Sequence, residues 1–368
     1  MDNQITVTRP FLPPLDEFVP YLEQIWENKW LTNNGPFHQQ FEQKLMEYLG
    51  VPFISVFTNG TLALLTALQA LEIKGEVITT PYSFVATAHS LLWNGITPVF
   101  TDVEDVFGNL DPQRIESAIT DRTSAILPVH VYGNPCNHFE IEKIAKKNNL
   151  KLIYDAAHCF GVKENGVSIA NYGDLSILSF HATKVFNTFE GGAIISHSRE
   201  MKQKIDDLKN FGFRDETTVI AAGINAKMNE LQAAFGILHL KYIDETIVKR
   251  KEIAELYRME LQYVDGIRIL NDIPNIHHNY SYFPIFIDTK KYGKSRDTLY
   301  ELLKDKGIYT RKYFYPLISE LPLYSNLPTS NRANLPIAYN IANQVLCLPI
   351  YPDLDLKDVC TILSFIRI

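Results

Sequence analysis

An alternation of short apolar runs with helix-like segments, from about residue 51 to residue 196, constrains the fold of this chain more than any other feature. The runs have the length and composition of buried strands: FISVF, EVITT, TPVFTDV, SAILPVH, KLIYDA, LSILSF and GAIIS. The segments between them place apolar residues at helical spacing, as in TLALLTALQALE and HFEIEKIAKKNN. Strands that alternate with helices predict an α/β protein with a mostly parallel sheet covered on both faces.

The pattern changes in the second half of the chain. Residues 200–263 read as long helices, and after DGIRIL strands and helices mix in an α+β manner, with YSYFPIFID as a strand and SRDTLYELLKDKG as a helix. We therefore expect a large domain over residues 1–245 and a smaller α+β C-terminal domain over residues 246–368. The N-terminal segment, with its prolines and the helix pattern DEFVPYLEQIWEN, is expected to pack across both parts.

Charge and composition narrow the class of protein. The formal net charge of −7 argues against broad binding to nucleic acid or to an anionic membrane. No apolar run approaches the ~20 residues that span a bilayer, and the opening MDNQITVTRP has no apolar signal core. The four cysteines are widely spread without a CxxC pair, and the histidines show no metal-ligand spacing. We expect a cytoplasmic protein without a metal, a nucleic-acid partner or a membrane partner.

A lysine follows the apolar strand DLSILSF, in the stretch SFHATKVFNTFEGG. Lysine is rarely buried unless it is paired or bonded, and the short loops after strands carry the chemistry of many α/β proteins. Lys184 is therefore either a working amine or a surface charge at a strand end.

An acid ends another buried strand, in LIYDAAHCFG. A buried carboxylate is unfavourable without a partner, and a cationic ring nitrogen would be such a partner for Asp155. A helix cap, or an ion pair with Arg or Lys, explains the same residue. His158, three residues later, either flanks a ligand or is an ordinary buried histidine.

The stretch TNGTLALL follows a strand and opens a helix, which makes it a candidate anion site. Gly60 would let the backbone approach a phosphate, and the hydroxyls of Thr58 and Thr61 could add bonds. A plain N-cap by Thr58 or Asn59 is the alternative. The chain has no GxxxxGK[ST] loop and no GxGxxG here, so the usual nucleotide signatures are missing.

Two further residues complete a set that fits one cofactor. Phe84, in PYSFVATAH, either lies on a flat ligand or packs in the core, and Ser179 can hold a phosphate oxygen. A phosphate-binding helix end, an aromatic lid, an acid for a pyridinium nitrogen and an imine-forming lysine are together what pyridoxal 5′-phosphate requires. Lys184 would hold the cofactor as an internal aldimine and, once displaced, would act as a general base.

These motifs resemble those of the DegT/DnrJ/EryC1/StrS family of pyridoxal-phosphate-dependent sugar-nucleotide aminotransferases. The resemblance covers nearly the whole chain, from TNNGPFHQQFEQKLMEYLGV through DAAHCFG and SFHATKVFNTFEGGAI to GINAKMNELQAA, TRKYFYPL and LCLPIYP. It implies the fold of the pyridoxal-phosphate-dependent transferases of fold type I, which is that of aspartate aminotransferase. Its large domain carries a central, mostly parallel sheet, and its C-terminal α+β domain is smaller.

The resemblance also implies roles for particular residues. Lys184 corresponds to the lysine that forms the aldimine, and Asp155 to the partner of the pyridine nitrogen. The other implied cofactor contacts are ring stacking by Phe84, a contact of His158 with the ring hydroxyl, and phosphate binding by Gly60, Thr61 and Ser179.

Asn225, in GINAKMNELQAA, corresponds to an asparagine that reaches the phosphate of a neighbouring subunit, so the resemblance implies a homodimer with shared sites. The family often has Gly-Tyr-Asn and an arginine in this stretch, whereas this chain has Gly223-Ile224-Asn225 and Lys227. One branch of the family carries histidine at the position of Lys184 and performs dehydration. The lysine here favours transamination.

The activity implied is transfer of an amino group from L-glutamate to a nucleotide-linked keto-sugar. The opening RPFLPPLDEFVPYLEQIWENKWLTNNGPF looks most like enzymes that aminate C4 of dTDP-4-keto-6-deoxyglucose for O-antigen or a related surface glycan. Amination at C3 of a dTDP-3-keto-6-deoxyhexose is the alternative. A non-catalytic regulator of the same fold and another pyridoxal phosphate reaction also stay open, although an intact Lys184 and Asp155 argue against the regulator.

Three residues are candidates for substrate contacts. Arg214, in FGFRD, could pair with a pyrophosphate. Tyr313 and Tyr315, in TRKYFYP, could bond sugar hydroxyls or stack on thymine. A surface arginine and packed aromatic rings explain the three residues equally well.

Overall fold

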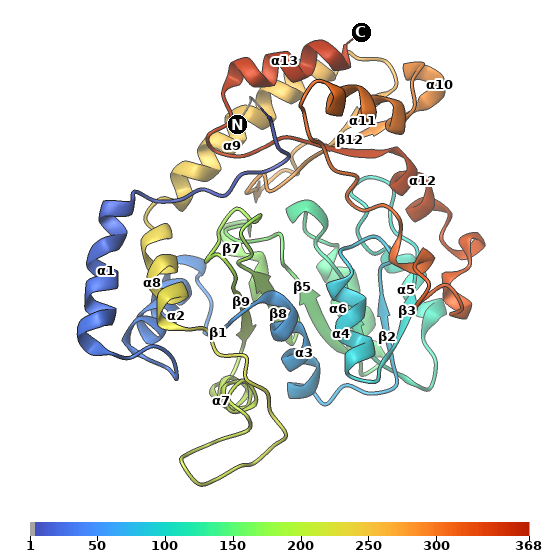
Figure 1. The fold of residues 1–368 in the computed structure, drawn as a ribbon. Helices are drawn as coiled ribbons and strands as arrows, with labels where there is room; N and C mark the ends of the chain where they lie inside the picture. Colours follow the sequence, from blue (N-terminus) through green and yellow to red (C-terminus); the bar gives the residue numbers. More distant parts are fainter. Residues whose placement is uncertain (1–3, 368) are drawn as a thin grey trace.

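A seven-stranded sheet forms the centre of the computed structural model, which describes residues 4–367 (Figure 1). The strands are β1 (Phe53–Phe57), β2 (Glu76–Thr79), β3 (Thr97–Phe100), β4 (Thr123–Leu127), β5 (Lys151–Asp155), β8 (Leu175–Ser179) and β9 (Gly192–Ser196). Their order is β1-β9-β8-β5-β4-β2-β3. All neighbours from β8 to β3 are parallel, whereas β9 is antiparallel to both β1 and β8. The predicted mostly parallel sheet is confirmed.

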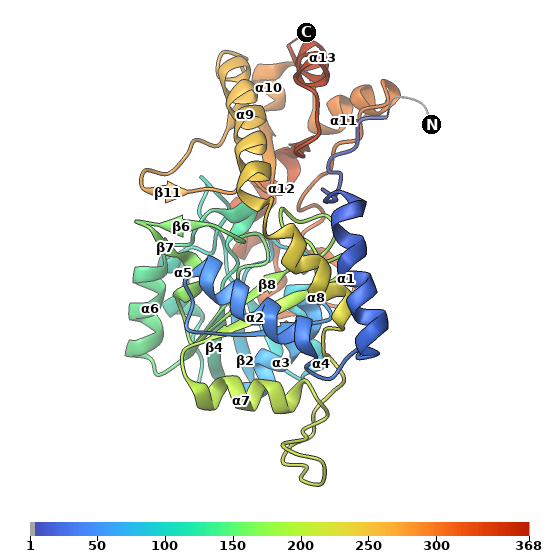
Figure 2. The same ribbon diagram turned by 90° about the vertical axis from the view of Figure 1, so that its left-hand side faces the viewer.

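Helices cover both faces of this sheet. One face carries α3 (Gly60–Ala70), α4 (Ala86–Trp93) and α7 (Arg199–Leu208). The other carries α2 (Pro36–Leu49), α5 (Pro112–Ile115), α6 (His138–Lys147) and α8 (Glu230–His239) (Figure 2). Successive strand residues point to opposite faces, so Ile194 of β9 packs in the first layer while Ala193 and Ile195 pack in the second. This two-sided burial explains why the strands read as continuous apolar runs.

The C-terminal part is built on a small antiparallel sheet of order β10-β12-β13. Its elements are α9 (Ile243–Leu261), β10 (Ile267–Ile269), β12 (Phe283–Ile287), α10 (Thr289–Tyr292), α11 (Arg296–Asp305), α12 (Pro336–Gln344), β13 (Val345–Leu348) and α13 (Leu356–Ile366). A third sheet, of order β11-β6-β7, links the halves through β11 (Ile276–His277), β6 (Lys163–Glu164) and β7 (Val167–Ser168). The expected boundary at residue 245 falls in the first turn of α9, and the division into two domains stays a prediction.

The N-terminal segment contacts both parts, as expected. Helix α1 (Leu15–Asn28) packs beside α8. Before it, Ile5 pairs in parallel with Ile308, and the Val7 carbonyl accepts a hydrogen bond from the Ile350 N–H at 3.0 Å. Residues 1–3 and 368, which end the two expected domains, lie outside the described residues. Between residues 4 and 367, no helix is long and apolar enough to cross a membrane.

Candidate active site

A cavity of about 240 Å³ lies where the carboxyl ends of β1, β2, β5 and β8 meet the C-terminal part. The carboxyl ends of parallel strands share one edge of a sheet, which is where α/β proteins bind ligands. The sequence-predicted residues that line the cavity are Gly60, Thr61, Phe84, Asp155, His158, Ser179, Lys184 and Tyr313. The fold therefore gathers residues from four separate strand ends into one site.

Lys184 is half-buried in the wall of the cavity. Its Nζ donates a hydrogen bond to the hydroxyl of Tyr282 at 3.2 Å. Burial lowers the pKa of this amine to about 8, although the negative charge of Asp155 opposes the shift. A lysine with such a pKa has a usable neutral fraction near neutral pH and is a competent nucleophile and base.

Asp155 is buried at the end of β5, and the cation that acts on its carboxyl among the described residues is Lys184. Its Oδ2 accepts a hydrogen bond from the Thr87 hydroxyl at 2.8 Å, and its Oδ1 accepts one from the Ala157 N–H at 3.1 Å. Burial nevertheless raises the pKa of the carboxyl above its usual range, against these bonds and the charge of Lys184. A cationic ring nitrogen in the cavity would favour the ionised form of this acid.

The N-terminus of α3 lines the cavity. Asn59, not Thr58, caps the helix, because its side chain accepts the Leu62 N–H at 2.9 Å. The N–H groups of Gly60 and Thr61 belong to the first turn of α3, and N–H groups in the first turn of a helix have no carbonyl partner within that helix. Both residues line the cavity, whereas Thr58 does not. The cap reading of TNGTLALL is confirmed for Asn59, and the anion site stays a prediction.

Gly60 packs directly against Ser179 at this end. A Cβ atom on residue 60 would lie 3.1 Å from the Ser179 Cβ and 3.3 Å from its Oγ. A side chain here would crowd the Ser179 hydroxyl, so the glycine leaves the hydroxyl and the N-terminus of α3 accessible from the same cavity.

His158 and Phe84 flank the middle of the cavity. His158 is buried, its Nδ1 accepts the Tyr132 N–H at 3.2 Å, and burial holds its pKa well below the ordinary value. Its ring stacks on Phe314, with centroids 5.9 Å apart and planes at 5°. Phe84 is 59% exposed, so this ring is free to cover a ligand and is not a core residue.

Three sequence-predicted residues lie outside the cavity. Asn225 and Arg214 belong to the segment between α7 and α8, residues 210–229. The middle of this segment projects from the body of the molecule (Figures 1 and 2), whereas its end packs against β1, since Ala226 is buried and its carbonyl accepts the Thr58 N–H at 2.9 Å. The Arg214 guanidinium donates two hydrogen bonds to Asp207, at 3.1 and 2.6 Å. Tyr315 is exposed, with its ring 4.4 Å from the Arg296 guanidinium carbon.

The cavity residues that sequence reasoning missed include Thr87, Tyr282 and Phe314. Thr87 had a signal, because it lies in PYSFVATAH, the stretch after β2 in which Phe84 was already a candidate. Phe314 stands between the two tyrosines of TRKYFYP that were considered. Tyr282 had none, because it precedes a strand that belongs to the other half of the chain.

The residues present fit pyridoxal 5′-phosphate. The cavity wall contains an amine whose pKa is lowered by burial and a carboxyl whose pKa is raised by burial. It also contains a helix N-terminus beside a hydroxyl, and an exposed aromatic ring. No group of three or more His, Cys, Asp or Glu side chains suited to a metal occurs within residues 4–367.

Known proteins resemble this chain along nearly its whole length. The chain is 57% identical over 357 residues to a dTDP-4-amino-4,6-dideoxy-D-glucose transaminase of Escherichia coli, covering 96% of this chain and 95% of the relative. It is 53% identical over 367 residues to a protein of the same description from Shigella dysenteriae, covering 100% and 99%. The crystal structure of DesI in the presence of its TDP-sugar product matches with a TM-score of 0.95 at 34% identity, covering 100% of this chain and 93% of DesI.

These matches confirm the predicted fold class, that of the pyridoxal-phosphate-dependent transferases of fold type I. Residues 15–367 match the DegT/DnrJ/EryC1/StrS aminotransferase family along their whole length. The chain belongs to the DegT/DnrJ/EryC1/StrS aminotransferase family.

Proposed function

We propose that this protein is a pyridoxal-phosphate-dependent aminotransferase that moves an amino group from L-glutamate to C4 of dTDP-4-keto-6-deoxyglucose. The observation that carries the proposal is that the Lys184 amine and the Asp155 carboxylate face one cavity, each with a pKa shifted by burial. The descriptions of two relatives that are more than half identical support the sugar, the nucleotide and the C4 position.

Bound in this cavity, pyridoxal phosphate would supply an electron sink for the carbanion at the substrate carbon. Lys184 Nζ would bond covalently to the aldehyde carbon of the cofactor and, when released, would take and return the proton at the substrate carbon. Its pKa of about 8 supports this exchange, because both protonation states are populated near neutral pH. Asp155 would keep a proton on the ring nitrogen, held in place by Thr87 and Ala157.

The other cavity residues would bind and orient the cofactor. The N–H groups of Gly60 and Thr61 and the Ser179 hydroxyl would hold the phosphate at the N-terminus of α3. Phe84 would cover one face of the ring, and neutral His158 would contact the ring hydroxyl.

For the sugar nucleotide we propose contacts from Tyr313, Tyr315 and Arg214. Tyr313 is supported by its place in the cavity wall. Tyr315 lies two residues further along the same segment. Arg214 stands on the projecting segment 210–229, so in this proposal it reaches a substrate bound to a neighbouring subunit.

We also propose a homodimer in which Asn225 reaches the cofactor phosphate of the neighbouring subunit. The projecting segment exposes large apolar side chains, and exposed apolar patches of this kind mark interaction surfaces. These side chains are Phe211, Phe213, Val219, Ile220 and Ile224. A second copy of the chain would cover them and would bring Asn225 toward a cavity.

The proposed location is the cytoplasm, where the product would feed synthesis of O-antigen or a related surface glycan. The cysteines support a reducing compartment, because Cys136, Cys159, Cys347 and Cys360 are all free and three of them are buried.

The test is an absorbance titration of the purified protein with pyridoxal phosphate. A visible band of covalently bound cofactor that bleaches on addition of L-glutamate would support the first half-reaction. Restoration of the band by dTDP-4-keto-6-deoxyglucose, and not by a dTDP-3-keto-6-deoxyhexose, would support the C4 acceptor. Absence of any band would favour the non-catalytic regulator.

A further inference from the structure

Tyr282 from the C-terminal half touches the amine of Lys184. The Lys184 Nζ lies 3.2 Å from the Tyr282 hydroxyl oxygen and 5.7 Å from the centre of the ring. The two residues are 98 positions apart in the chain. Among the contacts of the Lys184 side chain, this is the one hydrogen bond found within residues 4–367.

The Tyr282 ring is held by aromatic neighbours in the cavity wall. It meets the His158 ring edge to face at 4.9 Å and the Tyr313 ring edge to face at 5.6 Å. These contacts limit the ring to one position, so the hydroxyl is presented to the cavity in a fixed direction.

The backbone that leads to Tyr282 is fastened to the large part of the molecule. The Asn279 side chain donates hydrogen bonds to the carbonyls of His158 and Phe160, at 2.8 and 2.9 Å. The Ser281 hydroxyl donates to the Tyr132 carbonyl at 2.8 Å. Both donors are buried, so the segment 279–282 is attached to the large part of the molecule by hydrogen bonds that are shielded from solvent.

A buried arginine adds a third anchor. Arg250 of α9 donates from Nη1 to the carbonyls of Tyr280, at 3.4 Å, and Ile350, at 3.0 Å. No carboxylate acts on Arg250 among the residues that the structure describes, and burial lowers the pKa of its guanidinium to about 10. A buried charge without an acidic partner is unfavourable, and here it serves to hold the backbone two residues before Tyr282.

We propose that Tyr282 is a positioning residue for Lys184, whose hydroxyl holds the free amine over the cavity in reach of the cofactor's aldehyde carbon. This inference rests on the proposed role of Lys184. A lysine side chain has four rotatable bonds and loses reactivity when it samples many rotamers. Fixing the amine near its target removes that loss before the reaction begins.

The step that depends on this placement is the covalent capture of pyridoxal phosphate. The neutral Lys184 amine adds to the aldehyde carbon, a C=N bond forms, and the aldehyde oxygen leaves as water with the two amine protons. Tyr282→Phe keeps the ring and its packing but removes the hydroxyl. We expect it to slow this capture about tenfold, which is the effect of one hydrogen bond to a charged or ionisable group.

The experiment measures the capture rate with protein freed of cofactor, by stopped-flow absorbance after mixing with pyridoxal phosphate. Borohydride reduction and peptide mapping identify the modified lysine. Tyr280→Phe is the matched control, because it removes a hydroxyl two residues earlier that donates instead to Asp272, at 3.1 Å. Pyridoxamine phosphate serves as a second probe, since it fills the same cavity without bonding to Lys184.

The expected result is slow capture in Tyr282→Phe, wild-type capture in Tyr280→Phe, and affinities for pyridoxamine phosphate that agree within about twofold in all three proteins. Equal capture rates in Tyr282→Phe and wild type would overturn the role of Tyr282 but not the proposed function. A parallel loss of capture rate and of pyridoxamine phosphate affinity would also overturn that role, because Tyr282 would then shape the cavity and would not specifically position the Lys184 amine. Failure of the wild-type protein to bond at Lys184 would instead overturn the proposed function.

Discussion

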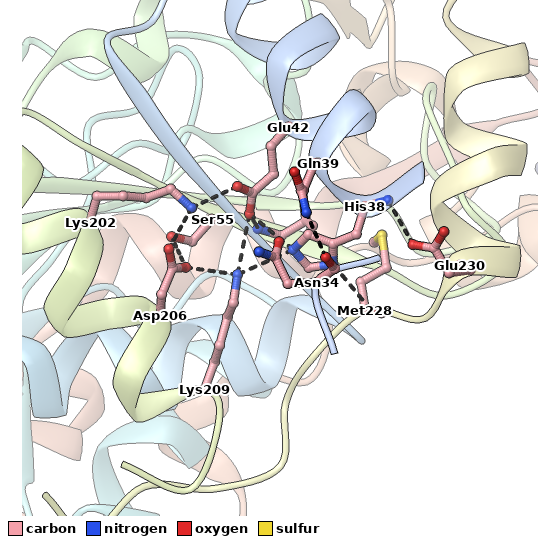
Figure 3. A network of polar contacts seen from close by, with 11 residues as sticks. Asn34, His38, Gln39, Glu42, Ser55, Lys202, Asp206, Lys209, Met228 and Glu230 are labelled. Atoms are coloured by element: carbon pink, nitrogen blue, oxygen red, sulfur yellow. Dashed lines mark hydrogen bonds and ion pairs between the residues drawn. The ribbon is translucent and has the colours of Figure 1, made fainter. Parts of the chain in front are cut away.

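The Glu42 carboxylate and the Lys209 ammonium form a buried ion pair, 3.2 Å apart, that joins α2 to the end of α7 (Figure 3). Lys202 lies 2.7 Å from the second carboxylate oxygen of Glu42, and Asp206 bridges the two lysines at 2.7 and 2.8 Å. Lys209 is the residue before the projecting segment 210–229. The cluster therefore fixes the root of the segment that carries Asn225.

We expect Glu42→Gln to lower the free energy of unfolding by about 3 kcal/mol, because removing one partner leaves Lys209 buried without full compensation. Urea denaturation measures the change. The control is Glu245→Gln, which breaks an exposed pair with Lys249 at 2.8 Å and should cost no more than about 0.5 kcal/mol. Similar losses of unfolding free energy in the two variants would show that the buried pair stabilises the fold no more than the exposed pair does.

The contribution of Glu42 should depend on pH. Burial opposes its ionisation, but Lys209, His38 and Lys202 hold the pKa of the carboxyl well below its ordinary value of 4.5. A carboxyl whose pKa is lowered by folding stabilises the native state above the unfolded value and loses that contribution as pH falls through the folded value. The difference between wild type and Glu42→Gln should therefore be constant above about pH 4.5 and shrink below it. A difference that grows on acidification would contradict this sign.

Lys184 should titrate far below an ordinary lysine. Burial lowers its pKa to about 8 from 10.5, so reaction of the cofactor-free protein with an amine reagent should rise through pH 8 and then level off. Lys249 is the internal control, because its hydrogen bond to Glu245 raises its pKa above 10.5. Mass spectrometry of the labelled peptides reports both sites. A common midpoint for the two lysines would refute the shift.

Asp155→Asn should weaken binding of pyridoxal phosphate about a hundredfold and slow turnover, because the neutral amide cannot balance a protonated ring nitrogen. It should also move the Lys184 midpoint below pH 8, since the Asp155 charge raises that pKa. Thr87→Val is the milder comparison: it removes the 2.8 Å hydrogen bond to the carboxylate and keeps the charge. A fluorescence titration gives the affinities. An Asp155→Asn protein with wild-type affinity and rate would make the acid purely structural.

Mixing two inactive variants tests whether sites are shared between subunits. We expect Lys184→Ala and Asn225→Ala to be inactive or weak alone. In a mixed dimer, Lys184 of one chain would meet Asn225 of the other and rebuild one intact site, so an equal mixture should regain about a quarter of wild-type activity. If each site used its own Asn225, remixing the variants would restore nothing.

Local sequence patterns were sufficient for most of the large part of the molecule. Each of the seven apolar runs forms a strand of the central sheet, because burial on both faces leaves an unmistakable Val- and Ile-rich signature. The same logic placed Lys184, Asp155 and Gly60 at one edge, since all follow parallel or adjoining strands. The sequence left Thr58 and Asn59 as alternative N-caps of α3, and only the hydrogen bond to the Asn59 side chain distinguished them.

The sequence by itself determined the strand ends, the chemistry of the groups placed there and the family they resemble. Only the tertiary structure decided which distant residues complete the cavity. Tyr282 reaches Lys184 because the C-terminal half folds back over the sheet. Asn225 does not line the cavity, because it pairs with Asn210 where the loop between α7 and α8 returns to the body. Contacts between residues about a hundred positions apart depend on how whole layers pack, and no periodicity within a short stretch encodes that packing.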